Sequence, residues 1–291
     1  MGNDRVKWFE PMEAAKDLAL QATTPIICHN GHREAQHGMG TFLQVGEKKF
    51  LVTAAHVINN AVNARYGMSV FDGIHVDSGS QGIRLTGQPI QLQGTIDVAV
   101  VELSDETSSR LLSRKFLSLA YFHMKPVRPG SFCLFGFPTS ETGDFPDGKG
   151  KYMAPFAYGT VNYPGDPNLL EDFDVKEHIA LYRGSDNAVD REGNPRSMPA
   201  KLEGISGCPI WQVHIQGQST HGWTPQSIYV VGVQTGVSKS AIRATQCWAV
   251  ERILWDEFPS LRNILELYGC TPSEMEKSKI KYAEVTFATP T

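Results

Sequence analysis

The chain has 291 residues, of which 41% are hydrophobic and 20% are charged. This composition is typical of a globular protein with a sizeable core, and the length allows one large or two small domains. Lysine and arginine number 27 against 31 aspartate and glutamate residues, which gives a formal net charge of -4. The sequence therefore lacks the basic surplus of a protein that binds nucleic acid or an anionic membrane, and we expect neither as a partner.

Signal sequences and the number of cysteines indicate in which cellular compartment a protein works. The amino-terminal stretch MGNDRVKWFEPMEAAKDLALQ carries charges of both signs along its length and lacks the apolar core of about 7–15 residues found in secretory signals. No run of about 18 apolar residues predicts a membrane span. The five cysteines are odd in number and widely spaced, which favours free thiols over a disulfide framework: Cys28, Cys133, Cys208, Cys247 and Cys270. We expect a cytoplasmic protein.

A predicted helix comes first, and two groups of short strands follow it. Pro11–Ala22 combines a proline suited to a first helical turn with residues that favour helix. Runs rich in β-branched and aromatic residues, separated by turn residues, predict six strands: Thr24–His29, Thr41–Val45, Lys49–Thr53, Met68–Val76, Ile83–Leu92 and Asp97–Leu103. A second set of six follows: Phe132–Phe137, Phe156–Asn162, His178–Tyr182, Pro209–His214, Ile228–Gly236 and Lys239–Thr245. Two sets of six strands indicate two barrels or sandwiches.

The carboxy-terminal part changes to helical periodicity. Apolar residues at helical spacing predict a helix over Cys247–Phe258, and a shorter helix, Leu261–Tyr268, ends at Gly269. The last ~20 residues are polar and without periodicity, which predicts a tail. Two segments between the strands, Thr139–Met153 and Arg183–Ala200, are rich in glycine, proline and acidic residues. We expect these two segments to be loops that shape binding specificity.

Three polar residues stand where apolar runs begin or end. His56 follows FLVTAA, Asp97 opens DVAVVEL, and Ser206 lies between glycines in GISGCP. A serine nucleophile needs a base to accept its proton and a buried carboxylate to orient that base. Asp97 would be costly to bury without a hydrogen bond, and a pair with His56 would supply one. Taken singly, each has an ordinary interpretation as a strand-end histidine, a turn-capping acid or a turn serine.

The sequence around the serine predicts a tight turn. Gly204 and Gly207 flank Ile205 and Ser206, and glycine tolerates the backbone angles that such a turn requires. In this turn the N–H groups of Gly204 and Ser206 remain free to face a developing oxyanion. Gly-x-Ser-Gly also occurs in ordinary turns.

Three blocks together resemble the trypsin-like (chymotrypsin-fold) serine peptidases: GMGTFLQVGEKKFLVTAAHVI, IDVAVVEL and LEGISGCPIW with YVVGVQTG. The resemblance covers about Thr24 to Thr245 and keeps the family's order of blocks. It implies an all-β fold of two six-stranded antiparallel β-barrels with the catalytic groups in the cleft between them. With the predicted helices, the expected parts are an N-terminal helical extension (1–23), a first barrel (24–115), a second barrel (116–245), C-terminal helices (246–269) and a tail (270–291).

The resemblance also implies residue roles. His56 would be the general base, Asp97 its orienting carboxylate and Ser206 the nucleophile, with an oxyanion hole formed by the amides of Gly204 and Ser206. Other positions would bind substrate, as the pocket floor or as a strand edge that pairs with it: Ala200, Val233, Gln234, Thr235 and Gly236. Gly236 would leave the entrance of the first specificity pocket open.

The expected function is hydrolysis of peptide bonds in a peptide or protein substrate through an acyl-enzyme, with no cofactor and no metal. Activity should fall on the acid side as His56 becomes protonated. The substrate, the cleavage preference and the oligomeric state do not follow from the sequence.

The chain departs from the family pattern next to the nucleophile. Ile205 stands where many members carry an aspartate, so activation through pairing of a newly cut amino terminus with that aspartate is not expected. Cys208 replaces the usual glycine two residues after the serine. Ala200, with Lys201 beside it, gives no acidic pocket floor, so we do not predict cleavage after lysine or arginine.

Other interpretations stay open. A trypsin-like module that is catalytically silent, or that an activating partner switches on, would bind peptides or proteins in the same groove. A cysteine peptidase using Cys208 would have Ser206 rather than glycine at its oxyanion-hole position. Zinc binding in CHNGHREAQH, whose spacing matches no standard Cys/His site, would use Cys28, His29, His32 and His37.

Overall fold

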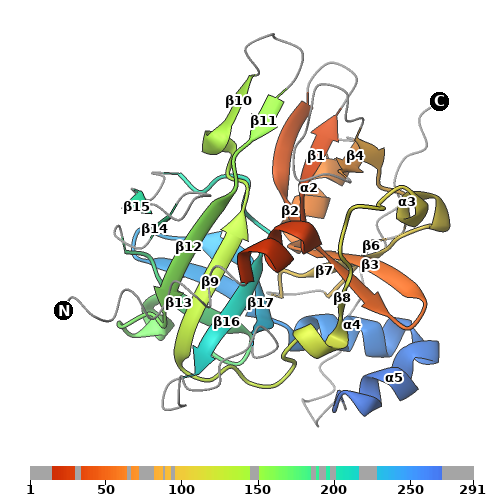
Figure 1. The fold of residues 1–291 in the computed structure, drawn as a ribbon. Helices are drawn as coiled ribbons and strands as arrows, with labels where there is room; N and C mark the ends of the chain where they lie inside the picture. The colour runs from red at the N-terminus through yellow and green to blue at the C-terminus, as the bar shows by residue number, and fades with distance from the viewer. Residues whose placement is uncertain are drawn as a thin grey trace.

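The computed structural model describes residues 15–29, 34–63, 67–71, 82–87, 89–92, 96–144, 151–184, 188–189, 195–196, 201–215 and 228–270. A helix over residues 15–22 leads into two β-sheets that lie side by side (Figure 1). The predicted beginning of this helix, residues 11–14, and the predicted tail, residues 271–291, lie outside the described residues.

The first sheet contains β1 (Thr23–His29), β2 (Glu34–Val45), β3 (Lys48–Thr53), β4 (Gly67–Val70), β5 (Ile83–Arg84), β6 (Pro89–Gln91), β7 (Ala99–Glu102) and β8 (Leu117–Ser118). Its strand order is β5-β4-β1-β2-β3-β7-β6, and β8 pairs with β2. The two ends of this order, β5 and β6, follow one another along the chain. One stretch of chain therefore pairs with β4 at one end and with β7 at the other, which closes the sheet into a barrel.

The second sheet contains β9 (Gly130–Gly136), β12 (Phe156–Val161), β13 (His178–Tyr182), β14 (Ala188–Val189), β15 (Pro195–Arg196), β16 (Pro209–Ile215), β17 (Tyr229–Val237) and β18 (Ala241–Gln246). Its order is β13-β18-β17-β16-β9-β12-β14-β15. An antiparallel bridge between Asn162 and Leu181 joins the end of β12 to β13. Six strands therefore form a closed ring, to which β14 and β15 are added.

The prediction of an all-β fold with two six-stranded antiparallel barrels is confirmed, with local differences. A hairpin of β10 (Thr142–Asp144) and β11 (Lys151–Met153) lies within the first segment predicted as a loop, and β14 and β15 lie within the second. Paired backbone groups satisfy one another without any apolar pattern, so the side chains gave no signal for these strands. β8 belongs to the first sheet, although its residues fall in the range predicted for the second barrel.

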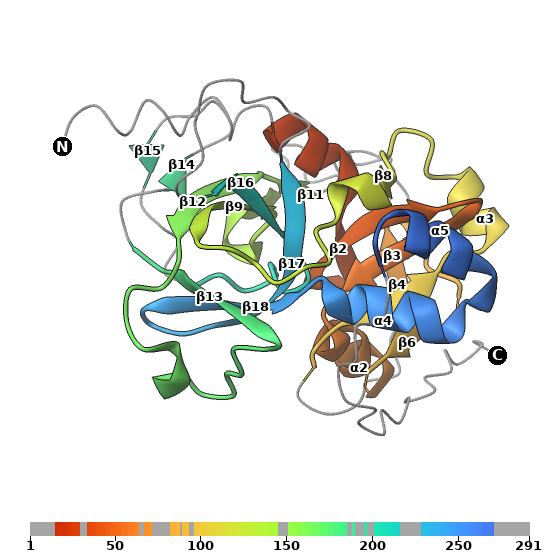
Figure 2. The same cartoon turned by 90° about the horizontal axis from the view of Figure 1, so that it is seen from below.

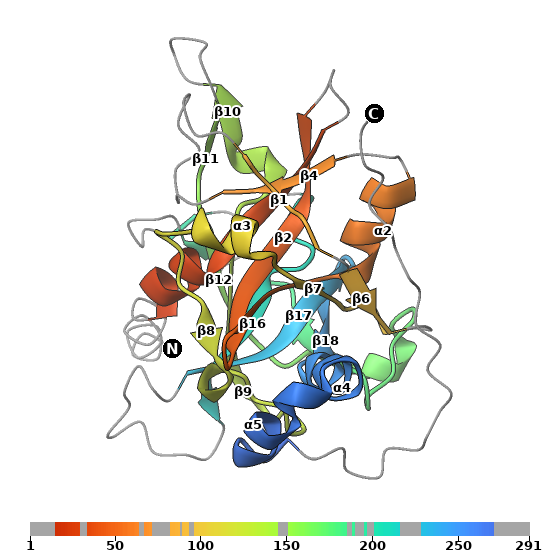
Figure 3. The ribbon, with the colours of Figure 1, turned by 90° about the vertical axis from the view of Figure 1, so that its right-hand side faces the viewer.

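The helices are α2 (Ala55–Asn63), α3 (Asp105–Ser109), α4 (Trp248–Glu257) and α5 (Arg262–Leu267), with 3₁₀ turns η1 (Leu119–Tyr121), η2 (Thr139–Glu141), η3 (Pro167–Leu169) and η5 (Pro259–Leu261). The predicted C-terminal helices are thus α4 and α5. Figure 2 shows β18 leading into α4, which lies against the first barrel. Figure 3 shows the first barrel with α2 at one side and α4 and α5 below it. Among the described helices, none is long and apolar enough to cross a membrane.

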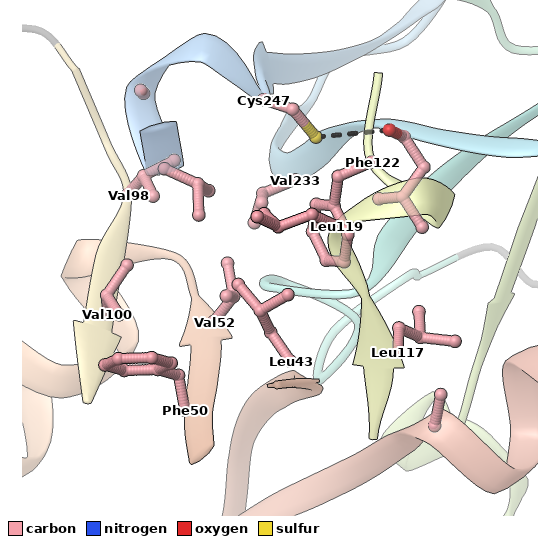
Figure 4. Close-up of a cluster of buried hydrophobic side chains, with 14 of the residues drawn as sticks. Leu43, Phe50, Val52, Val98, Val100, Leu117, Leu119, Phe122, Val233 and Cys247 are labelled. Carbon is pink, nitrogen blue, oxygen red and sulfur yellow. Dashed lines mark hydrogen bonds between the residues drawn. The ribbon is translucent and has the colours of Figure 1, made fainter. Parts of the chain in front are cut away.

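Strand β3 lies between two apolar clusters. Phe50 and Val52 point into a cluster that joins the first barrel, β17 and α4 (Figure 4). Leu51 points into the interior of the first barrel. This division follows from the alternation of side chains along a strand. Because all three residues are at most 1% exposed, β3 is buried on both faces and forms a rigid support for the segment that follows it.

A buried carboxylate on α4 makes stability depend on pH. Glu251 is 9% exposed, and burial raises the pKa of its carboxyl from 4.5 to about 7. In the unfolded chain the carboxyl has its ordinary pKa, so between these two values the folded state binds more protons than the unfolded state. Stability should therefore fall as the pH rises through this window.

We expect E251Q to raise the free energy of unfolding at about pH 8, by up to about 3 kcal/mol, and to flatten its pH dependence between about pH 5 and 8. Urea denaturation at several pH values measures both effects. E257Q, at an exposed position of the same helix, is the matched control and should leave the pH dependence unchanged. An E251Q profile parallel to the wild-type profile would contradict the prediction.

Candidate active site

His56 and Asp97 are joined by two hydrogen bonds. The first turn of α2 carries His56 directly after β3, and Asp97 stands just before β7, which pairs with β3. His56 Nδ1 lies 2.6 Å from Asp97 Oδ2, and the His56 backbone N–H donates to Asp97 Oδ1 at 2.8 Å. A carboxylate that accepts from Nδ1–H leaves Nε2 as the proton acceptor of the ring. The His56 side chain is 38% exposed, so a substrate can reach it.

Close backbone packing brings the turn of Ser206 to the end of β3. Gly204 and Gly207 have φ values of +86° and +92°, in the left-handed region that favours glycine. A Cβ atom at Gly207 would lie 2.1 Å from the carbonyl oxygen of Met39 and 2.4 Å from Thr53 Oγ1. The Met39 N–H also donates to the Ser206 carbonyl at 2.7 Å. Ser206 therefore lies beside the strand end that leads to His56.

Two amides of this turn are available as donors. The N–H groups of Ile205, Gly207 and Cys208 donate to carbonyls of the protein, the last two at 2.8 and 2.9 Å. The N–H groups of Gly204 and Ser206 donate to no described residue. An oxyanion hole needs backbone donors that are free of bonds within the protein, so both amides are candidates for that role. Sequence reasoning predicted these two amides for that role.

No hydrogen bond joins the Ser206 hydroxyl to His56, both of which lie in the described part of the chain. The bond between a nucleophile and its base is often long before a substrate binds. The structure thus brings two members of the predicted triad into direct contact and holds the third nearby through its backbone.

Gln36, which sequence reasoning missed, links the barrels at this turn. It lies on β2, and its Nε2 donates to the carbonyl of Gly204 at 2.8 Å and to that of Phe137 at 2.5 Å. Its partners are 168 and 101 residues away in the chain, so no local pattern could reveal the contact. By fixing the Gly204 carbonyl, Gln36 also fixes the peptide plane next to the candidate oxyanion hole, which makes it a positioning residue.

The residues that flank Ser206 on the apolar side pack into the second barrel. Ile205 and Cys208 are each 1% exposed and belong to the apolar cluster inside that barrel. Burial raises the pKa of the Cys208 thiol well above its ordinary value. A buried thiol of this kind is a poor nucleophile, so the structure argues against the cysteine peptidase interpretation. All five cysteines are free and buried.

The proposed zinc ligands are not gathered in the part of the chain that the structure describes. Cys28 is 1% exposed, and burial raises the pKa of its thiol to about 12. His32 and the side chain of His29 lie outside the described residues. Among the described residues, no three His, Cys, Asp or Glu side chains could together hold a metal ion.

The predicted substrate edge continues from the turn of the serine. Gln234 accepts from the Gly207 N–H at 2.8 Å and donates its own N–H to the Cys208 carbonyl at 2.9 Å, so its backbone already bonds within the protein. Its side-chain Nε2 donates to the Gly236 carbonyl at 3.0 Å. Val233 pairs with Pro209, and Thr235 lies where the register with β18 shifts. Ala200, the predicted pocket floor, lies outside the described residues.

His178, also missed from the sequence, is a buried histidine near the candidate triad. It is 3% exposed, and burial lowers its pKa, as does the positive charge of Arg243. The negative charges of Glu177, Asp174 and Asp97 act in the opposite direction. Its environment therefore favours the neutral ring.

Comparisons with known proteins concern the fold. Neither a protein-family model nor a curated protein matches the chain. The chain is similar in structure to the scabies mite inactivated protease paralogue S-I1, with a TM-score of 0.49, 15% identity and coverage of 84% of this chain and 97% of that one. It is also similar to the protease Anisep from Arthrobacter nicotinovorans, with a TM-score of 0.47, 14% identity and coverage of 82% of this chain and 96% of that one. A third similar structure is HBP, with a TM-score of 0.47, 11% identity and coverage of 84% of this chain and 92% of that one. At such identities a shared fold does not carry a shared activity.

Proposed function

We propose that this chain is a serine endopeptidase in which His56 is the general base, Asp97 orients it and Ser206 is the nucleophile. The observation that carries the proposal is the pair of hydrogen bonds between His56 and the Asp97 carboxylate. One joins His56 Nδ1 to Oδ2 at 2.6 Å, and the other joins the His56 backbone N–H to Oδ1 at 2.8 Å. These bonds fix the ring and its tautomer and leave Nε2 to accept a proton.

In the proposed reaction, His56 Nε2 takes the Ser206 proton as Oγ attacks the carbonyl carbon of the scissile bond. The resulting oxyanion accepts hydrogen bonds from the amides of Gly204 and Ser206, which donate to no described residue. The protonated His56 then gives its proton to the leaving amine. Water, deprotonated by the same ring, releases the acyl group and restores the Ser206 hydroxyl.

A fluorophosphonate probe, which phosphonylates activated serines, tests the proposal on the full chain. We expect the wild type to be labelled and S206A not to be, with hydrolysis of a peptide substrate falling about 10⁶-fold in S206A. S109A removes a serine on the exposed helix α3 and is the matched control. Thermal melting of each variant separates loss of activity from loss of fold.

A wild type that stays unlabelled under all conditions would overturn the proposal and favour a silent binding module. Labelling that begins only when another protein is added would indicate the partner-activated form. Labelling that persists in S206A would place the reactive serine elsewhere in the chain.

A further inference from the structure

Arg243 lies beside the edge of β17 that runs on from the Ser206 turn. It pairs in register with Gly236 across β17 and β18. Its Nη1 donates to the carbonyls of Asp172 and Glu171, at 2.7 and 3.2 Å. These two bonds from Nη1 hold the guanidinium against the backbone of residues 171–172 and so fix the orientation of the whole group.

The other edge of the guanidinium, Nε and Nη2, bonds to no residue that the structure describes. A Cβ atom at Gly236 would lie 3.2 Å from Nε and 3.3 Å from Nη2 of Arg243, so a glycine without a side chain lies against this edge. Nε is buried and has no hydrogen-bond partner among the described residues. Arg243 makes no ion pair with a described carboxylate. Nε–H and Nη2–H form the fork that binds a carboxylate through two parallel hydrogen bonds.

Two further buried polar atoms lie on the same face. His178 pairs with Thr245, and Ala180 pairs with Arg243, so alternation along the strands puts His178, Thr245 and Arg243 on one side of β13 and β18. His178 is 3% exposed and Thr245 is 0% exposed, and in the described part of the chain neither His178 Nε2 nor Thr245 Oγ1 has a hydrogen-bond partner. Buried polar atoms are normally paired. Three unpaired ones on one face point to a polar ligand.

This face adjoins the part of β17 that leads away from the Ser206 turn. The carbonyl of Gln234 accepts from Gly207, the residue after the nucleophile, and Gly236 is two residues further along the strand. In the proposed mechanism, a substrate strand lying along residues 234–236 would bring to Arg243 the side chain of the residue whose carbonyl Ser206 attacks. Two carboxylates of this region already have partners: Asp97 is bonded to His56, and Asp174 Oδ1 accepts from the Lys176 N–H at 2.8 Å.

We propose, on the basis of the proposed peptidase function, that Arg243 is a specificity-determining residue that binds an aspartate or glutamate side chain directly before the cleaved bond. The carboxylate of that side chain bonds to the Nε–Nη2 edge, and Thr245 and His178 provide further polar partners beside it.

Fluorogenic peptides that differ only in the residue before the cleaved bond test this proposal. For the full-length wild type we expect kcat/KM for glutamate or aspartate to exceed that for glutamine or asparagine by about 10²-fold or more, because the neutral analogue leaves Arg243 unpaired. R243A should lower this ratio about 10²-fold, and R243K, which keeps the charge but loses the fork, should lower it by less. Cleavage after lysine should be slowest.

R183A removes the same charge from a neighbouring arginine that bonds to the Ser238 carbonyl and is the matched control. A fall in the acid-to-amide ratio in R183A equal to that in R243A would show a diffuse charge effect and overturn the proposal. An equal loss of kcat/KM for all peptides in R243A would overturn it too, in favour of a purely structural role.

A wild type whose Ser206 is labelled by the fluorophosphonate but which shows no acid preference refutes this inference alone. A wild type that is never labelled refutes the proposed function itself.

Discussion

Replacing Asp97 with asparagine is expected to lower kcat about 10⁴-fold at neutral pH without unfolding the protein. Asp97 accepts from both the Nδ1 and the backbone N–H of His56. An asparagine has one acceptor for these two donors, and its amide group would then face one of them. If that group faces Nδ1, the proton of the imidazole moves to Nε2, and the ring cannot take the proton of Ser206.

The measurement is kcat on a peptide substrate together with the rate of fluorophosphonate labelling, which should fall in parallel. E102Q is a suitable control, because Glu102 lies on the adjacent strand β7 with its side chain 39% exposed and paired to Lys48. An exposed pair contributes little, so E102Q should keep near wild-type activity. A D97N variant that keeps kcat within about tenfold of the wild type would show that Asp97 does not orient the base.

Local patterns predicted the parts of this site that belong to strand ends. β3 is apolar on both faces and stops at Thr53, so a polar residue just beyond it, His56, stood out. Asp97 stood out in the same way before β7. The pairing of β3 with β7 then brings the two together, and the order His, Asp, Ser supplied the expectation of that contact.

The contacts that hold the turn and shape specificity could not be predicted in this way. Gln36 is one polar residue in a mixed strand, and its bond to Gly204 spans 168 residues. In the sequence, Arg243 looks like an ordinary solvent-facing residue that alternates with apolar residues along β18. Only its pairing with Gly236 in the folded structure shows what its guanidinium faces. Such roles depend on which chain segments the barrels bring together, and the side-chain pattern within one segment does not record that.

Ile205 provides the second large expected effect, because it anchors the turn that carries both candidate oxyanion amides. Its side chain is 1% exposed. It packs close to Gly136 on strand β9, where an added Cβ atom would lie 3.5 Å from Ile205. Truncating a buried isoleucine costs about 2–5 kcal/mol in stability. We therefore expect I205A to be destabilised by that amount.

We also expect I205A to lose kcat by about 10²-fold, since Gly204 and Ser206 adjoin the cavity and a displaced oxyanion donor costs about that much. Denaturant unfolding and peptide hydrolysis at a temperature where the variant remains folded measure the two effects. I205V removes one methylene, should cost about 0.5–1.5 kcal/mol and should keep most of the activity. If I205A were as active as I205V, the Gln36 bond to Gly204 would suffice to hold the turn. If I205A loses activity while folded and I205V does not, apolar packing at Ile205 keeps the turn assembled. Many trypsin-like peptidases instead have an aspartate at this position, which forms an ion pair.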